Sequence, residues 1–200
     1  MKHKQLRRAG LAFGLALLLF FGLGCLRLAK TAWYSRQGLA ETRTLAWRQL
    51  SAVGLREYDA GREGLWYIST DSDPQLLWAG EAYIDTVRLN VRHQTPPQGV
   101  VLYWKTPGQA DFSPRQSVYA VQTGEGEYTF DLGGVRVSEL RIDPDSLGGV
   151  ITRFDGVTLN PPRPWYQVFL PGWGGALLLV CGPLAVLAAA AQLRRALGRE

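Results

Sequence analysis

The stretch LRIDPDSLGGVITRFDGVTL, residues 140–159, decides the fold of this chain. An alternating run reaches Asp143-Pro144, the pair Gly148-Gly149 follows, and a second β-rich run ends at Leu159. Aspartate before proline and paired glycines are turn residues, so they fix where each strand stops. The stretch therefore predicts a strand, a turn and a last strand that close a β domain.

Upstream of this stretch, short runs rich in bulky and β-branched residues recur between turn residues. Val87, Leu89 and Val91 alternate with polar residues, which is typical of a half-buried strand. The expected strands cover residues 65–68, 87–91, 100–105, 117–121, 128–132, 139–143 and 156–159. No long helical period interrupts them. This spacing predicts an all-β sandwich or jelly roll over residues 64–160.

Two apolar segments flank the expected β domain, at residues 9–29 and 166–193. A bilayer core needs about 20 helical residues, so each segment can form a transmembrane helix. The second contains Pro171 and Pro183, which can kink it. Two alternatives remain open for the first segment. It could be a cleaved secretory signal, or Cys25 could carry a lipid, since Gly22-Leu23-Gly24-Cys25 partly resembles a lipobox.

The charges beside the apolar segments predict the topology. The net charge is +5, and basic residues gather in a head at residues 1–8 and in a tail at residues 194–200. Positive residues favour the cytoplasmic side of a membrane. Both termini are therefore expected in the cytoplasm, with the β domain outside the inner membrane, in the periplasm or the extracellular space. The basicity indicates orientation, and nucleic acid is not an expected partner.

Residues 30–63 are expected to connect the first span to the β domain, mainly as a helix. Leu39, Leu45, Leu50 and Val53 can share one helical face. Such an amphipathic helix would pack beneath its own domain or lie on membrane lipid. The polar, glycine-bearing residues 57–64 would then form a linker.

Residues suited to catalysis are few. The histidines are His3 and His93, and both cysteines lie in the apolar segments, so no catalytic triad, β-domain disulfide or Cys/His metal site is indicated. The interpretation is a protein that is not an enzyme and needs no cofactor. The aspartate pairs at 71 and 73, or at 143 and 145, could hold a calcium ion. Because aspartate before proline caps turns, a structural role is favoured.

Aromatic rings are the other candidate for a site, because an exposed ring can stack on the apolar face of a sugar. The candidates for sugar stacking are Trp78, Tyr83, Trp104 and Tyr119. The competing interpretation is that most of them fill the core, as aromatic residues do in small sandwiches. Tyr103 and Trp104 must face opposite sides of their strand. One of the two therefore lies outside the core face, or the strand is covered on both sides.

The second apolar segment carries a surface of small residues. It comprises Gly172, Gly174, Gly175 and Gly182. Small side chains let membrane helices approach closely. This surface could pack against the first span or against another subunit, and the alternative is the ordinary composition of a membrane helix.

The order of motifs in the middle region resembles a galactose-binding-like jelly-roll module, of the kind found with bacterial membrane glycosyltransferases and surface-polysaccharide proteins. The matching residues are Asp73-Pro74-Gln75, Val87–Val91, Leu102-Tyr103-Trp104, Phe112-Ser113 and Leu140–Leu159. The resemblance covers about half of the chain and neither apolar segment.

The resemblance implies a non-catalytic accessory subunit in cell-surface polysaccharide synthesis or export. Its expected partners are a membrane glycosyltransferase or polysaccharide-export protein, together with the glycan polymer. The alternative is a structural subunit of a membrane complex that binds protein through its β domain and its spanning helices.

Overall fold

The computed structural model describes residues 2–198 and divides the chain into two compact units. One unit joins Met1–Ala29 with Arg163–Glu200, and the other, the β unit, is Lys30–Pro162. Arg199, and the side chains of Lys2, Lys4, Arg194 and Arg195, contribute to the expected topology but fall outside the described residues.

The β unit is built from antiparallel strands that form one continuous sheet. The strands are β1 (Arg43–Leu45), β2 (Ser51–Val53), β3 (Leu55–Glu57), β4 (Leu65–Ser69), β5 (Gln75–His93), β6 (Val101–Lys105), β7 (Ser117–Tyr119), β8 (Val121–Gly124), β9 (Glu127–Asp143) and β10 (Ile151–Leu159). Their main order across the sheet is β3-β4-β10-β5-β9-β6-β7. The all-β fold expected from residues 140–159 is thus confirmed.

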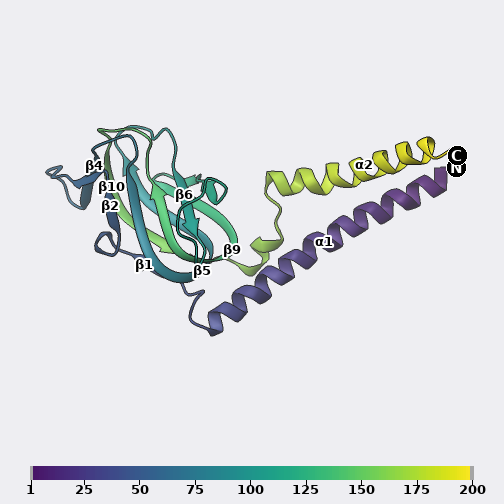
Figure 1. The fold of residues 1–200 in the computed structure, drawn as a ribbon, viewed down its shortest axis with the longest axis horizontal. Coiled ribbons are helices and arrows are strands. Elements are labelled where there is room, and N and C mark those ends of the chain that lie inside the picture. The colour runs from purple at the N-terminus through teal and green to yellow at the C-terminus, as the bar shows by residue number, and fades with distance from the viewer. Residues whose placement is uncertain (1, 199–200) are drawn as a thin grey trace. The chain divides into compact units, whose positions relative to one another are not determined.

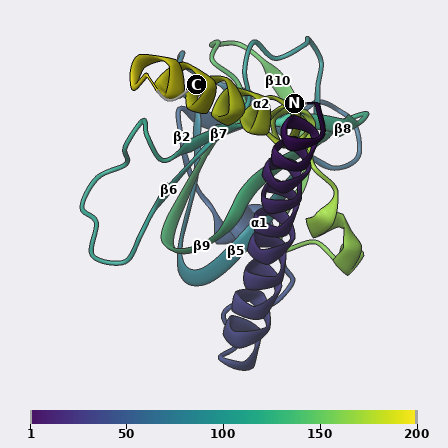
Figure 2. The ribbon, with the colours of Figure 1, turned by 90° about the vertical axis from the view of Figure 1, so that its right-hand side faces the viewer.

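The long strands β5 and β9 fold this sheet into a two-layered sandwich. Their first and last halves pair with different neighbours: the early half of β5 pairs with β2, and its late half pairs with β10. The pairing of β5 with β9 shifts register between Ala79 and Ala82 and again between Ile84 and Thr86. Such irregularities bend a strand. Figures 1 and 2 show β5 and β9 curving side by side through the unit.

The core lies between the two layers. Val87, Leu89 and Val91 are fully buried on the late half of β5, as their alternation predicted. Phe130 and Val157 from the neighbouring strands β9 and β10 are equally buried. Burial of such side chains stabilises each by about 1.5–3 kcal/mol relative to exposure.

The expectation of a helical connector at residues 30–63 is contradicted by the structure. Beyond the end of the first helix, this region forms β1, β2 and β3 with one short 3-10 turn, η1 (Trp47–Gln49). Leu45 is buried because β1 pairs with β10, where Leu45 lies opposite Val157. The apolar residues that fit a helical face are satisfied instead by pairing with strands distant in sequence. The compact β unit therefore begins at Lys30, well before residue 64.

Asn160 links the segment that precedes β1, the middle of β5 and the segment that follows β10. Its side-chain amide donates to the carbonyl of Tyr83 at 2.8 Å, and its side-chain oxygen accepts from the N–H of Asp85 at 2.8 Å. Its own carbonyl accepts from the hydroxyl of Thr42 at 2.7 Å. Tyr34 stacks on Tyr83 with ring centroids 4.3 Å apart. Both connectors to the membrane segments are thus fastened to the middle of β5.

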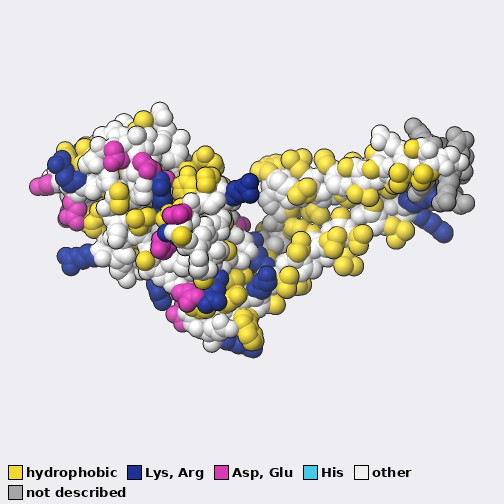
Figure 3. Space-filling model, in the orientation of Figure 1, with side chains coloured by type: hydrophobic (Ala, Val, Ile, Leu, Met, Phe, Trp, Pro, Cys, Tyr) yellow, Lys and Arg dark blue, Asp and Glu magenta, His cyan; other side chains and the backbone are white. Residues whose placement is uncertain are grey.

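The other unit contains the two apolar segments. Its elements are the helix α1 (Lys2–Arg36), which runs on into the β unit, the short 3-10 helix η2 (Trp165–Phe169) and the helix α2 (Trp173–Ala196). The segments Arg7–Arg36 and Trp165–Leu193 are long and apolar enough to cross a membrane. Figure 3 shows apolar side chains along both helices, whereas charged side chains gather on the β unit.

The second span is interrupted at Pro171, between η2 and α2. Proline lacks the backbone N–H that would continue a helix. A regular helix therefore begins again only at Trp173. Phe169 of η2 packs on α1, where the centroid of its ring lies 5.7 Å from the centroid of the Phe21 ring. A Cβ atom at Gly24 would lie 2.6 Å from the ring of Phe169. Gly24 therefore permits a close contact between the two apolar segments.

We expect Gly24→Leu to lower the thermal unfolding midpoint of the detergent-solubilised chain by several degrees, because the new side chain would displace Phe169. Gly22→Leu is the matched control, since the space around Gly22 is open. Equal midpoints for the two variants would contradict the contact.

Candidate functional site

A groove lies on the β unit between the loop 94–99 and the region of β7 and β8. It consists of two adjoining hollows of about 370 and about 300 Å³. Both hollows are lined by Pro96, Pro97, Gln122 and Tyr128, so they form one continuous feature. Residues from β5, β7, β8 and β9 converge on it, which is typical of a binding site.

The walls of the groove are held by backbone geometry. On one side, consecutive prolines at 96 and 97 stiffen the loop that follows β5. On the other, Gly126 adopts φ +70° and its carbonyl accepts from the N–H of Val91 at 2.9 Å. The N–H of Ala120 donates to the carbonyl of Val100 at 2.9 Å. These contacts bring β7 and β8 beside the proline loop.

The buried carboxylate of Asp145 holds the proline loop, residues 94–99, in place through a hydrogen bond. Asp145 is 3% exposed, and one of its oxygens accepts from the N–H groups of Gln98, at 3.3 Å, and Ser146, at 2.6 Å. Its other oxygen has no hydrogen-bond partner within the described residues. Since a buried carboxylate needs hydrogen bonds to offset its lost hydration, Asp145 strongly favours the observed loop position.

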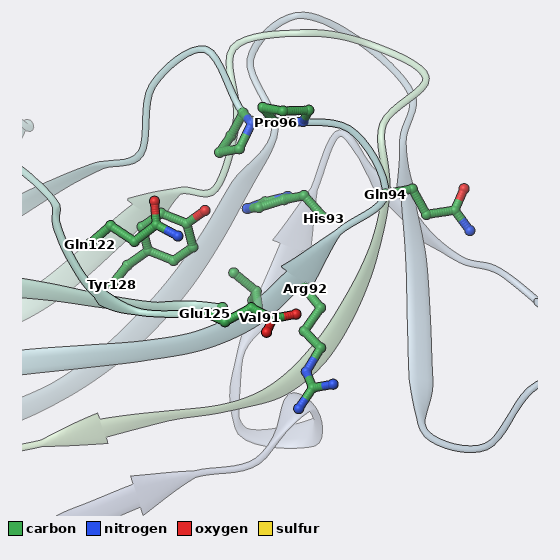
Figure 4. A pocket seen from close by; sticks show the side chains of 10 residues that line it. Val91, Arg92, His93, Gln94, Pro96, Gln122, Glu125 and Tyr128 are labelled. Atoms are coloured by element: carbon green, nitrogen blue, oxygen red, sulfur yellow. The ribbon is translucent and has the colours of Figure 1, made fainter.

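His93 lies at the floor of the groove. Its Nδ1 shares a hydrogen bond of 2.8 Å with the hydroxyl of Thr152, and its ring packs edge to face with that of Tyr128, with the ring centroids 5.7 Å apart. Burial lowers the pKa of His93 below its usual value, although the charge of Asp145 opposes this. Figure 4 shows His93 beneath Pro96, with Gln122 and Tyr128 across the pocket. The floor is thus uncharged at neutral pH.

The lowered pKa of His93 predicts a loss of stability in mild acid. The folded protein holds the imidazole neutral, whereas the unfolded chain takes up a proton near pH 6.5. The free energy of unfolding should therefore be constant above that pH and fall as the pH drops from about 6.5 towards the lower pKa of the folded state. Thermal unfolding between pH 8 and pH 5 measures this, and His93→Asn should flatten the profile in that window. An unchanged profile in His93→Asn would contradict the assignment.

The four aromatic candidates occupy different environments. Trp78 and Tyr83 are 7% and 3% exposed and belong to the interior, so they have no free face for a sugar. Their burial agrees with the competing interpretation, in which most of the aromatic candidates fill the core. Trp104 is half-buried and packs against the core, while its neighbour Tyr103 faces the other side of β6, under the guanidinium of Arg141. Tyr119 is 73% exposed and lines the groove.

The aspartates weighed as calcium ligands have structural partners. Asp71 accepts from the N–H of Asp73 at 2.9 Å, and Asp143 receives two hydrogen bonds from Arg141, at 2.7 and 2.8 Å. Arg141 also bonds to Asp73. These contacts are those of turn and strand-end residues. Within residues 2–198, no group of three or more His, Cys, Asp or Glu side chains is placed to hold a metal ion.

The glycines of the second span lie in open surroundings. A Cβ atom at Gly172, Gly174 or Gly182 would meet no atom within 4 Å, and at Gly175 it would meet only Pro171. In the described part of the chain, the glycine in close contact between the two apolar segments is therefore Gly24. The composition of the segments did not single out Gly24, because its role depends on Phe169.

Gln122, Glu125 and Arg92 also line the groove and were not singled out from the sequence. The prolines at 96 and 97 and the glycines near 124 mark turns. The sequence does not show that these two turns lie opposite each other, because that depends on the order of the strands in the sheet.

A further hollow of about 620 Å³ lies along residues 57–66. It is lined by Tyr58, Arg62 and Trp66 with their neighbours in sequence. One continuous segment forms it, from the end of β3 to the start of β4, so it is a weaker candidate than a groove on which residues distant in sequence converge.

No protein-family model matches the chain, and no curated protein is similar to it in sequence. Solved carbohydrate-binding modules are similar in structure. One is a low-affinity xylan-binding module from Roseburia intestinalis, with 17% identity and a TM-score of 0.38 over 60% of this chain and 94% of that one. A family 6 module from Clostridium cellulolyticum has 8% identity and a TM-score of 0.42 over 60% and 97%. A family 32 module from C. perfringens has 7% identity and a TM-score of 0.40 over 60% and 98%.

Because the TM-scores are low, the function of this chain is inferred below from its own surface.

Proposed function

We propose that the β unit binds a glycan in the groove between the proline loop and β8. The observation that carries this proposal is the pairing of exposed apolar ring surface with an amide side chain in one open groove. Tyr119 and Pro96 offer flat apolar faces, and Gln122 offers a donor and an acceptor for hydroxyl groups. Sugars present both kinds of surface.

The chain would hold this groove outside the cytoplasmic membrane. Two flanking helices are long and apolar enough to make a two-pass membrane protein. The arginines after the second span favour cytoplasmic termini. The groove would then face a growing or exported cell-surface polysaccharide, and the protein would act as a non-catalytic accessory subunit beside a membrane glycosyltransferase or polysaccharide-export protein.

Glycan binding can be tested with the full-length chain in lipid nanodiscs on a glycan array. Tyr119→Ala should weaken the binding of oligosaccharides and polysaccharides on the array, because it removes the exposed ring from the groove. Tyr58→Ala is the matched control, since Tyr58 is also exposed but lines the separate hollow at residues 57–66. Failure of the unsubstituted chain to bind any glycan would exclude the proposal.

The topology can be tested by labelling. Ser146 is exposed on the β unit, so Ser146→Cys in a Cys25→Ser, Cys181→Ser background provides one reactive thiol. A membrane-impermeant maleimide should label it in cells whose cytoplasmic membrane is intact. Labelling only after lysis of that membrane would place the β unit in the cytoplasm.

The alternative function is that of a structural subunit that binds protein through its second span. The open surroundings of Gly172, Gly174 and Gly182 favour this alternative, because small residues without neighbours leave room for another helix. A partner that copurifies in mild detergent, and is lost in Gly174→Leu, would support it. Retention of the partner in that variant would count against helix docking.

A further inference from the structure

The two ends of the groove differ in chemistry. Arg92 and Glu125 lie at one end, beside the turn at Gly126. Tyr119 lies at the other, with Gly99 and Val100. Neither hollow is enclosed, and the residues shared by both lie between the two ends. A site that closes around the end of a chain needs a wall beyond the last sugar, whereas a groove of this form lets a polymer pass through.

The groove has no excess of positive charge among its lining residues. Arg92 is 3.8 Å from Asp155, and Glu125 adds a carboxylate at the same end. The floor at His93 is neutral, since burial lowers the pKa of that imidazole. Recognition of carboxylate-bearing or phosphate-bearing polymers relies on arginine and lysine that remain available for pairing. The lining residues suit an uncharged ligand better.

The combined volume of the two hollows is large enough for more than one sugar ring. Each hollow, at about 370 and about 300 Å³, is at the lower end of the range for a small-molecule site. Because they adjoin, the full groove exceeds what one ring fills. The apolar face of Tyr119 and the charged side chains of Arg92 and Glu125 can then contact different sugar rings.

We infer that the groove binds an internal segment of an uncharged polysaccharide, with one sugar against Tyr119 and a following sugar towards Arg92 and Glu125. This inference rests on the proposed glycan-binding function and adds the class of ligand and the mode of binding. The end of the polymer takes no part in recognition.

Calorimetry on the full-length chain in lipid nanodiscs tests the inference; detergents with sugar headgroups are avoided because they would compete. The probes are β-1,4-linked oligosaccharides of glucose, xylose and galactose, from one unit to four, with the trimer of galacturonic acid as the charged comparison. In at least one neutral series, we expect the affinity to rise at least about tenfold from the monosaccharide to the trisaccharide. The galacturonic acid trimer should bind more weakly than that trisaccharide.

The outcomes separate the inference from the proposed function. A monosaccharide that binds as tightly as its trisaccharide, or a galacturonic acid trimer that binds best, would overturn the inference and leave glycan binding intact. Absence of binding to every probe would overturn the inference, and absence of binding to any glycan on the array would overturn the proposed function as well.

Two variants assign the ends of the groove. Tyr119→Ala should weaken the trisaccharide about tenfold and leave the monosaccharide nearly unchanged, because only the longer ligand reaches the aromatic end. Gln122→Ala, in the shared centre, should weaken both, and Tyr58→Ala should weaken neither. Circular dichroism confirms that each variant is folded. An unchanged trisaccharide affinity in Tyr119→Ala would overturn the two-ended arrangement.

Discussion

Replacement of Asn160 by alanine should destabilise the β unit by about 3 kcal/mol and lower its unfolding midpoint by roughly 10 °C. The substitution removes the acceptor of the Asp85 N–H and a donor to the Tyr83 carbonyl, both at 2.8 Å and within the buried middle of β5. Each buried backbone group left without that bond costs about 1–3 kcal/mol. Thermal or urea unfolding of the purified chain, followed by circular dichroism, measures the loss.

Two further substitutions at the same position separate the causes. Asn160 adopts φ +48°, a conformation that favours asparagine and glycine over alanine. Asn160→Gly removes the same hydrogen bonds but keeps this backbone conformation free of strain, so it should recover about 1 kcal/mol relative to alanine. Asn160→Asp keeps the acceptor for Asp85 and loses only the donor to Tyr83. A midpoint for Asn160→Ala equal to that of the unsubstituted chain would show that the two connectors are not fastened through this residue.

The sequence predicted the strands that alternate and missed those that depend on distant partners. Val87, Leu89 and Val91 form a regular period of two, and their burial matches it. Leu45 and Leu50 have spacings that also fit a helix, and only β10 and β5, far away in sequence, supply the partners that make this region β structure. Local pattern cannot contain that information, since the competing helix has the same apolar residues.

For a similar reason, the sequence could single out Tyr119 but could not show which of the aromatic candidates are exposed. Tyr119 was singled out and lies in the groove, but Tyr83 is buried, within an unbroken run of buried residues from 82 to 87. The chain around Leu39 lies against this run, because the carbonyl of Leu39 accepts from the N–H of Tyr83 at 2.8 Å. An alternating pattern cannot reveal a segment that is buried on both faces.

The same buried ring makes Gly134 a position on β9 that is sensitive to substitution. We expect Gly134→Ala to cost more than about 3 kcal/mol and to leave little folded protein. Its φ is +83°, and a Cβ atom there would lie 2.3 Å from the hydroxyl oxygen of Tyr83. The ring of Tyr83 cannot retreat, because it stacks on Tyr34 at 4.3 Å and its backbone is bonded to Leu39 and Asn160. Thermal unfolding and the yield of folded protein measure the effect.

The adjacent glycine supplies the control that isolates the collision. Gly133 has a similar φ of +72°, but a Cβ atom there would meet no atom within 4 Å. Gly133→Ala should therefore show only the cost of a left-handed alanine, about 1–2 kcal/mol. Addition of Tyr83→Phe to Gly134→Ala removes the oxygen at 2.3 Å but leaves the ring carbon at 2.9 Å, so stability should return only in part. If Gly133→Ala and Gly134→Ala were equally stable, backbone conformation alone would explain both glycines, and the packing of Tyr83 against β9 would be excluded as the cause.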